Sequence, residues 1–407
     1  MGKVSKNSID YYILPNKILC SMIGMWPFSE ERSTCRNAFS CFRLVFSVTA
    51  VCTIFVPGIM IIVVKWGDLK ILTGVGCILT TLAQCLFKTI YLVARKERSH
   101  RLYKELRSLW DSTDDPTEMQ CYQDLAHVAR TCTITFYSCG ALTSIVFIIS
   151  AALECMNVDV SNGTDSIRPL PFEVWYGIDV SESPRFEVVF VCQALASTIC
   201  AVAICSLDTA CVTAILHVCG QFKLISVWIS HIGFETDCNL TNYLVDSRRN
   251  LRTDLVKCIR HQQRLINVVK DVNTLMTPII FIQILTSGIE ICLSGFAVFS
   301  YDAGGDLFKF ISYLASMMVQ LLLWCWPGEI LAQESQKIGH SVYLNIPWYQ
   351  LPLIYRKKIL LMILRSQKYC SISALTFQSL SIYTLTSVFN TASSYFALLR
   401  QIQDQST

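Results

Sequence analysis

The sequence has few charged residues for its length. Lys, Arg, Asp and Glu make up 16% of its 407 residues, whereas hydrophobic residues make up 53%. A soluble chain of this size would form two or three domains with about 25% charged residues. The scarcity of charge therefore indicates a membrane protein.

Catalytic and metal-binding motifs are also missing. The chain has no Gly-x-Ser-x-Gly elbow, no His-Glu-x-x-His pair and no P-loop. It contains 20 cysteines, but no two form Cys-x-x-Cys, so we interpret them as mostly reduced, small apolar side chains. We expect no enzymatic activity, no cofactor, no metal site and no nucleic-acid partner.

What the sequence does contain is a series of long uncharged runs between grouped charges. The seven runs are Leu44–Val64, Ile71–Phe87, Thr131–Leu153, Val188–Leu207, Val272–Ile289, Phe310–Gly328 and Tyr369–Leu399. Most approach the roughly 20 residues that a helix needs to cross a bilayer. The second run reaches that length by including Lys88, which either snorkels or faces protein, and the fifth by passing Glu290. We predict an all-α membrane protein with seven transmembrane helices.

The distribution of Lys and Arg predicts the orientation. Of the 34 basic residues, 28 fall in the alternate segments 1–43, 88–130, 217–271 and 329–368. Excess positive charge stays in the cytoplasm. We therefore expect a cytoplasmic amino terminus and an extracellular carboxyl terminus. The largest outer loop, 154–187, has seven acidic residues against two basic ones.

These boundaries divide the chain into six parts. They are a cytoplasmic segment 1–43, spans one to four in 44–216 with the extracellular loop 154–187, cytoplasmic helices in 217–271, spans five and six in 272–328, a cytoplasmic segment 329–368 and the seventh span in 369–404. Apolar residues between Leu255 and Val269 recur at helical spacing and run directly into the fifth span. This pattern predicts helices that extend into the cytoplasm and pack on each other or on other subunits.

The outer loop carries two further candidates. Asn162-Gly163-Thr164 is a glycosylation sequon on the extracellular side, whereas the sequon at Asn239 lies on the cytoplasmic side. Cys155 and Cys192 flank the same loop, and a disulfide between them is left open.

A metabotropic G-protein-coupled receptor is the main alternative for seven spans. The predicted orientation is opposite to that of this class. No Asp-Arg-Tyr or Glu-Arg-Tyr follows the third span, and Asn390 in the seventh is followed by Thr391 rather than by Pro. These features favour another class.

Five stretches along the chain resemble the insect odorant receptors. They are Gly24-Met25-Trp26-Pro27, "HVCGQFKLIS" after the fourth span, "CIRHQQRLINVVKDVNTLMTPIIFIQIL" entering the fifth, "WCWPGEIL" ending the sixth and "TASSYFALLR" near the carboxyl end. The short segment 217–271 resembles the odour-tuning subunits rather than the co-receptor. The seventh span lacks the Thr-Tyr-x-x-x-x-x-Gln-Phe pattern of the related gustatory receptors.

The resemblance implies a function and its partners. Family members are similar in having cytoplasmic helix extensions that form an anchor domain, and a tetramer around a pore lined by the seventh span. A tuning subunit assembles with the co-receptor into a non-selective cation channel that a small volatile odorant opens. The expected location is the plasma membrane of olfactory sensory neurons, with the lipid bilayer around the spans.

The resemblance, combined with the orientation, also implies an odorant pocket in the outer halves of several spans. The candidate ligand-binding residues are Cys77, Ile78, Thr81, Phe147, Ile148, Gln193, Ala194, Ser197, Phe310, Tyr313 and Met317. Such a site would be mostly apolar with few polar contacts. Glu290 has two interpretations: a hydrogen-bonding group in the pocket, or a residue at the outer interface.

A stripe on the seventh span is the candidate pore lining. Thr391, Ser394, Leu398, Gln401 and Ile402 follow Ser387 at steps of mostly three or four residues and share one helix face. Similarity to the co-receptor's carboxyl end, matched at Tyr395, implies a gate at Leu398 and Ile402 and a filter at Gln401. The alternative is that the stripe packs against another helix.

Overall fold

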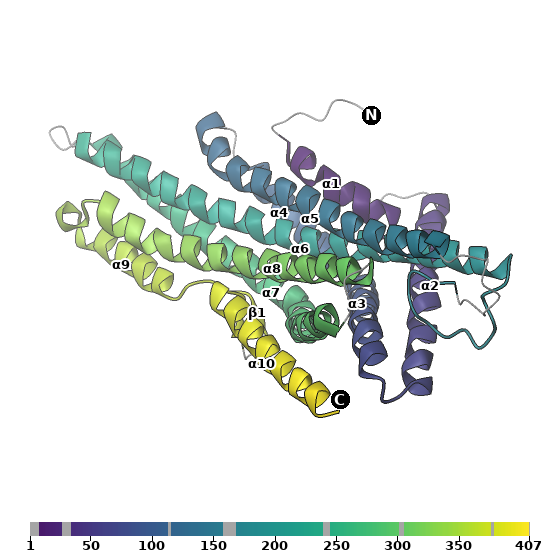
Figure 1. Ribbon diagram of the computed structural model, residues 1–407. Helices are drawn as coiled ribbons and strands as arrows, with labels where there is room; N and C mark the ends of the chain where they lie inside the picture. The colour runs from purple at the N-terminus through teal and green to yellow at the C-terminus, as the bar shows by residue number, and fades with distance from the viewer. Residues whose placement is uncertain are drawn as a thin grey trace.

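The computed structural model describes residues 8–26, 34–112, 115–157, 168–238, 245–300, 305–375 and 378–406. Asn162 and Asn239 lie outside these residues, and so does the side chain of Ile402. Nearly all of the described chain is helical (Figure 1).

Four helices are much longer than a membrane span. They are α5 (Pro116–Asn157), α6 (Arg185–Cys238), α7 (Val245–Ser300) and α8 (Gly305–Asn345), with 41 to 56 residues each. At 1.5 Å per residue they measure about 60–85 Å, whereas the hydrocarbon core is about 30 Å thick. The predicted extensions are therefore continuous with the spans. Helices α5, α6 and α8 run side by side in Figure 1, and α7 packs on α6 and α8.

Two further helices have the length of one crossing. They are α2 (Thr34–Val64) and α3 (Leu69–Ala94), and Asp68 caps α3 by accepting hydrogen bonds from the backbone N–H groups of Lys70 and Ile71. Together with α5 to α8 they make six described helices that are long and apolar enough to cross a membrane. The chain is a multi-pass membrane protein.

The seventh predicted span differs from the expectation of one continuous helix over 369–404. Residues 373–379 form a short antiparallel hairpin of β1 (Ser373–Ala374) and β2 (Gln378–Ser379), and α10 begins only at Ile382 and ends at Ser406. Ser381 caps it by accepting from the backbone N–H of Thr384. Serine and threonine side chains compete for backbone groups and favour such helix starts over helix interiors. With 25 residues, α10 is still about 37 Å long.

Shorter helices complete the bundle at its ends. They are α1 (Ile9–Met22), α4 (Lys96–Trp110), the 3₁₀ turn η1 (Trp348–Gln350) and α9 (Leu353–Gln367). Helix α9 packs on α8, and α1 packs on α5 and α6. Helix α10 packs on α7 and α8 and then diverges from the long helices (Figure 1).

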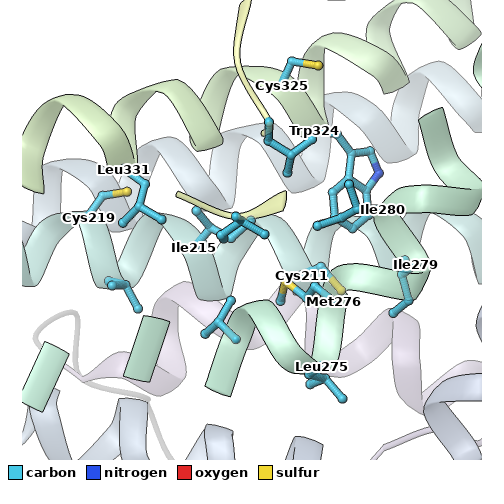
Figure 2. Packing of buried hydrophobic residues seen from close by; sticks show 14 of the residues in the cluster. Cys211, Ile215, Cys219, Leu275, Met276, Ile279, Ile280, Trp324, Cys325 and Leu331 are labelled. Atoms are coloured by element: carbon cyan, nitrogen blue, oxygen red, sulfur yellow. The ribbon is translucent and has the colours of Figure 1, made fainter. Parts of the chain in front are cut away.

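Helix α6 lies at the centre and packs on α5, α7 and α8. Figure 2 shows part of this core, in which Trp324 of α8, Ile280 of α7 and Cys211 of α6 belong to one buried cluster. The described cysteines are free thiols, and many are buried. Cys155 and Cys192 are both free thiols, so the structure does not contain a disulfide between them.

Candidate functional site

A cavity of about 750 Å³ lies among α2, α3, α5, α6 and α8. Its apolar walls include Ile54, Phe136 and Ile204, and its polar groups are hydroxyls and thiols. The cavity therefore suits a small, uncharged and largely apolar molecule.

The structure brings six of the eleven candidate ligand-binding residues to the lining of this cavity. They are Ile78, Thr81, Phe147, Ser197, Tyr313 and Met317. Ile148 and Ala194 are half-buried outside the lining. Phe310 packs edge-on against Phe147, with ring centroids 6.3 Å apart. The carbonyl of Cys77 accepts a hydrogen bond from the Tyr313 hydroxyl at 2.9 Å.

Gln193, the remaining candidate, is fully buried and holds a loop over the cavity. Its Oε1 accepts from the backbone N–H of Phe172 at 3.0 Å, and its Nε2 donates to the Phe172 carbonyl at 3.2 Å. The Phe172 ring lines the cavity and stacks on Phe147 with centroids 5.5 Å apart. We call residues 168–184 the lid segment. Gln193 therefore positions the lid segment rather than lining the cavity.

One other contact fastens the lid segment to α2, and another forms within the segment. The backbone N–H of Trp175 donates to the carbonyl of Pro57 in α2 at 3.3 Å. At the far end of the segment, both the hydroxyl and the backbone N–H of Ser181 donate to the Asp179 carboxylate. These two hydrogen bonds, the one from the hydroxyl having the larger effect, hold the pKa of Asp179 below its usual value. The lid segment is thus ordered by polar contacts at several points.

Hydroxyl groups line the cavity in three contacting pairs. Thr143 and Ser316 are 2.6 Å apart, Ser144 and Ser197 are 3.1 Å apart, and Thr81 contacts Tyr313. Each pair joins two helices. The pairs are α5–α8, α5–α6 and α3–α8, so they tie the walls of the cavity together.

Glu290 lies behind one of these pairs. It is fully buried in α7, and its Oε1 is 2.9 Å from the Thr81 hydroxyl. Its Oε2 has no hydrogen-bond partner among the described residues. Glu290 is thus inside the bundle, adjacent to a cavity-lining hydroxyl, and does not face an interface.

The contacts around Glu290 share a limited number of protons. Three contacts lie in series, from Glu290 to Thr81, from Thr81 to Tyr313, and from Tyr313 to the carbonyl of Cys77. Each hydrogen bond needs one proton, and the two hydroxyls supply only two. The carboxyl group supplies the third if Glu290 donates to Thr81. The series then runs in one direction and ends on a backbone carbonyl.

A buried ion pair lies next to the cavity along α3 and α6. Lys88 Nζ is 2.5 Å from Asp208 Oδ1, and both side chains are fully buried. Lys88 also donates to Gln283 of α7 at 2.5 Å, while Gln320 of α8 donates to Asp208 at 2.6 Å. Lys88 thus faces protein, the second of its two predicted positions. The cluster therefore joins α3, α6, α7 and α8.

A second cavity of about 830 Å³ lies further along α6, beyond Asp208. It is lined by residues of α1, α3, α4, α6 and α7. Its polar lining is partly paired, since Asn16 donates to Thr213 at 2.7 Å. None of the predicted ligand residues lies in its wall.

The predicted pore stripe lies on the exposed face of α10. Thr391, Ser394, Leu398 and Gln401 are exposed in the single chain, with 55% of Leu398 accessible. The opposite face, which includes the buried Val388 and Ala392, packs toward the core. The stripe therefore does not pack within its own chain, and its place in a pore stays a prediction.

Several residues around the cavity were not predicted from the sequence. They include Thr143, Ser144, Phe172, Ala201 and Ser316. Small and hydroxyl residues are common in membrane helices, so no spacing separates these from others. The sequence did contain a signal for Asp208. This acidic residue directly follows one uncharged run, and the basic Lys88 directly follows another, so the two can pair inside the bundle.

The comparisons with known proteins agree with this architecture. Odorant receptor 10 of Aedes albopictus is 22% identical over 344 residues, which cover 83% of this chain and 86% of that protein. Odorant receptor 22c of Drosophila melanogaster is 22% identical over 395 residues, 96% of each chain. Odorant receptor 13a of the same fly is 24% identical over 97% of each.

Solved structures show the same fold. The insect olfactory receptor OR5 from Machilis hrabei superposes with a TM-score of 0.74 at 15% identity, over 97% of this chain and 98% of that one. A structure of the same receptor in complex with eugenol gives a TM-score of 0.74 at 14% identity, over 97% of both chains. At this identity the likeness concerns the fold.

A family profile described as "7tm Odorant receptor" matches residues 70–393, which is most of the chain and includes every wall of the first cavity except Ile54. The seven-span pattern, the long helices and the terminal sequence stretches all lead to the same assignment. This chain belongs to the 7tm odorant receptor family.

Proposed function

We propose that this chain is an odour-tuning subunit that binds a small volatile molecule in the cavity under the lid segment. With the co-receptor it forms a hetero-tetrameric, odorant-gated, non-selective cation channel in the plasma membrane of olfactory sensory neurons. The observation that carries the proposal is an apolar, hydroxyl-lined cavity among five membrane helices, closed on one side by Phe172. The complex of the Machilis receptor with eugenol supports a ligand site in this fold.

The route from ligand to pore passes through α7. This helix contacts α3 and α8, which line the cavity, and it also packs on α10. A Cβ added at Gly288 or Gly295 of α7 would lie 3.8 Å from Val388 or Phe396 of α10. Small residues at these two positions allow the helices to approach closely. A ligand that shifts α3 or α8 would therefore also move α10.

The exposed stripe on α10 supports a pore in the assembled channel. Hydroxyls at Thr391 and Ser394 would face permeating water, and Leu398 and Ile402 would close the pore by dewetting. Gln401 would form the filter ring. The long helical extensions and α9 offer an anchor for the neighbouring subunits, within the segments 217–271 and 329–368.

Electrophysiology with and without the co-receptor tests this function. We expect ligand-gated cation currents only when both chains are present, and we expect them to survive replacement of intracellular GTP by a non-hydrolysable GDP analogue. The variant Ala201→Leu, which fills the cavity from α6, should lose the response at normal surface expression. Currents that disappear with the GDP analogue would instead support the metabotropic receptor.

A glycosidase gel shift tests the orientation. A shift that disappears in Asn162→Gln but persists in Asn239→Gln would place the loop 154–187 outside and the amino terminus in the cytoplasm. A glycan on Asn239 would invert the topology and contradict the pore proposal for α10.

A further inference from the structure

The hydroxyl groups of the cavity differ from one another in what they can still donate. Each hydroxyl has one proton and two lone pairs. Where the proton is already used inside the protein, the group can only accept from a ligand. The fate of each proton therefore decides which ligand chemistry the cavity recognises.

One member of every pair donates to a backbone carbonyl. Thr143 donates to the carbonyl of Cys139 at 3.0 Å, and Ser197 donates to that of Ala194 at 3.0 Å. Tyr313 donates to the carbonyl of Cys77 at 2.9 Å. These three protons are unavailable to a ligand.

The other member of every pair donates to the first. Because the protons of Thr143 and Ser197 point at carbonyls, Ser316 donates to Thr143 and Ser144 donates to Ser197. The proton of Thr81 goes to Tyr313, to Glu290 or to the carbonyl of Cys77, and all three acceptors are within the protein. All six hydroxyl protons are thus used, whichever form Glu290 takes.

The remaining polar lining atoms are the thiols of Cys200 and Cys205, and they do not change this result. The Cys205 thiol points at the carbonyl of Phe136 at 3.7 Å, and a thiol is in any case a weak donor. The cavity therefore presents oxygen lone pairs on three sides and no free hydroxyl proton among its described lining residues.

We propose that the cavity selects uncharged apolar molecules that carry a hydrogen-bond donor, namely alcohols and phenols, over ketones and ethers of the same carbon skeleton. An alcohol donates to a lone pair without disturbing any pair. A ketone must either leave its oxygen unpaired or break a hydrogen bond between two helices. This inference rests on the proposed ligand site and names the ligand class.

Two probes with the same skeleton test the selectivity. We expect 2-octanol to activate the receptor at a concentration at least about fivefold lower than 2-octanone, because one net hydrogen bond is worth about 1 kcal/mol. Equal potency of the two compounds would overturn the inference.

A matched pair of variants tests the mechanism. Thr143→Val removes the oxygen acceptor of the Ser316 proton at nearly constant volume and leaves only the Cys139 sulfur, a weak acceptor 3.3 Å away. Ser316 can then donate to a ligand. We expect the preference for 2-octanol over 2-octanone to fall about fivefold. Ser316→Ala removes the Ser316 proton altogether, so the preference for 2-octanol over 2-octanone should not shift toward the ketone. An unchanged ratio in Thr143→Val would contradict the donor count.

Ser197→Ala provides a second, independent case. It removes the acceptor of the Ser144 proton from another wall of the cavity, and we expect the same shift toward the ketone. If Thr143→Val fails to reach the cell surface, this variant alone decides the outcome, and an unchanged ratio overturns the proposal.

Ligand binding to the purified full-length chain separates this inference from the channel proposal. A ligand that binds the folded state raises its unfolding temperature in lipid nanodiscs. We expect a larger rise with 2-octanol than with 2-octanone, and none in Ala201→Leu. This result without ligand-gated currents would reject the channel and keep the ligand class, whereas no rise with either compound would reject the site.

Discussion

Gln193 of α6 pairs with both backbone polar groups of Phe172, as a neighbouring strand would. The carboxamide oxygen accepts from the Phe172 N–H at 3.0 Å, and Nε2 donates to the Phe172 carbonyl at 3.2 Å. Nε2 also donates to the hydroxyl of Tyr176 at 3.2 Å. This pairing holds the Phe172 ring against Phe147 in the cavity wall. A polar residue buried in a membrane helix thereby determines where the lid segment closes the site.

Loss of this pairing should speed ligand release. Gln193→Leu removes both hydrogen bonds, each worth about 1 kcal/mol, so we expect ligand dissociation to accelerate at least about tenfold. Washout of currents after a brief ligand pulse measures this rate. Ser181→Ala is the matched control, since Ser181 bonds only within the lid segment to Asp179. An unchanged washout in Gln193→Leu would show that the lid segment does not limit ligand exit.

The buried ion pair should be far more sensitive to single than to paired substitutions. Lys88→Met leaves Asp208 as an uncompensated buried charge, which typically costs about 3–5 kcal/mol. We expect a sharp fall in the thermal midpoint and in surface expression. The double variant Lys88→Met with Asp208→Leu should recover much of both, because an apolar pair of similar size avoids the desolvation cost.

A surface ion pair supplies the control for that experiment. Lys337 and Glu334 are 2.5 Å apart, but 58% of the Lys337 side chain is exposed. Exposed pairs contribute about 0–1 kcal/mol, so Lys337→Met should leave the thermal midpoint nearly unchanged. A double variant at positions 88 and 208 that is no better than the single ones would argue for a role of the charges beyond stability.

Glu290→Gln and Glu290→Leu should separate the proton of the carboxyl group from its volume. A glutamine amide can donate to Thr81 as a protonated carboxyl group would, so Glu290→Gln should retain the response. Glu290→Leu removes that donor, and we expect the ligand concentration for half-activation to rise about fivefold or more. Dose–response curves at matched surface expression measure both. A complete loss in Glu290→Gln would indicate that the charged carboxylate is required.

Adjacent leucines on α10 test the pore stripe. Leu398 is exposed, whereas Leu399 packs toward the core. Leu398→Ser should wet the closed pore and produce a current without ligand. Leu399→Ser should lower surface expression without such a current. A basal current from the second variant and none from the first would place the stripe outside the pore.

The sequence alone was sufficient for the class, the helices and the family. Hydrophobic runs of about 20 residues have few alternatives in a bilayer, because every backbone group must be satisfied within the helix. The extension of α7 beyond its membrane span was visible as apolar residues at helical spacing between Leu255 and Val269. The start of the seventh helix could not be predicted, because residues 369–399 form one continuous uncharged run that shows no boundary between the hairpin and the helix at Ile382.

Only the tertiary structure decided which side chains share the cavity and which protons remain. Gln193 and Phe172 lie 21 residues apart, and Lys88 and Asp208 lie 120 apart. The rotation of each helix about its own axis decides whether such residues meet. The amino-acid sequence determined which segments form membrane helices, except for the start of the seventh. Their mutual rotation, set by the packing of α6 against its neighbours, determined the lid contact, the ion pair and the donor pattern of the cavity.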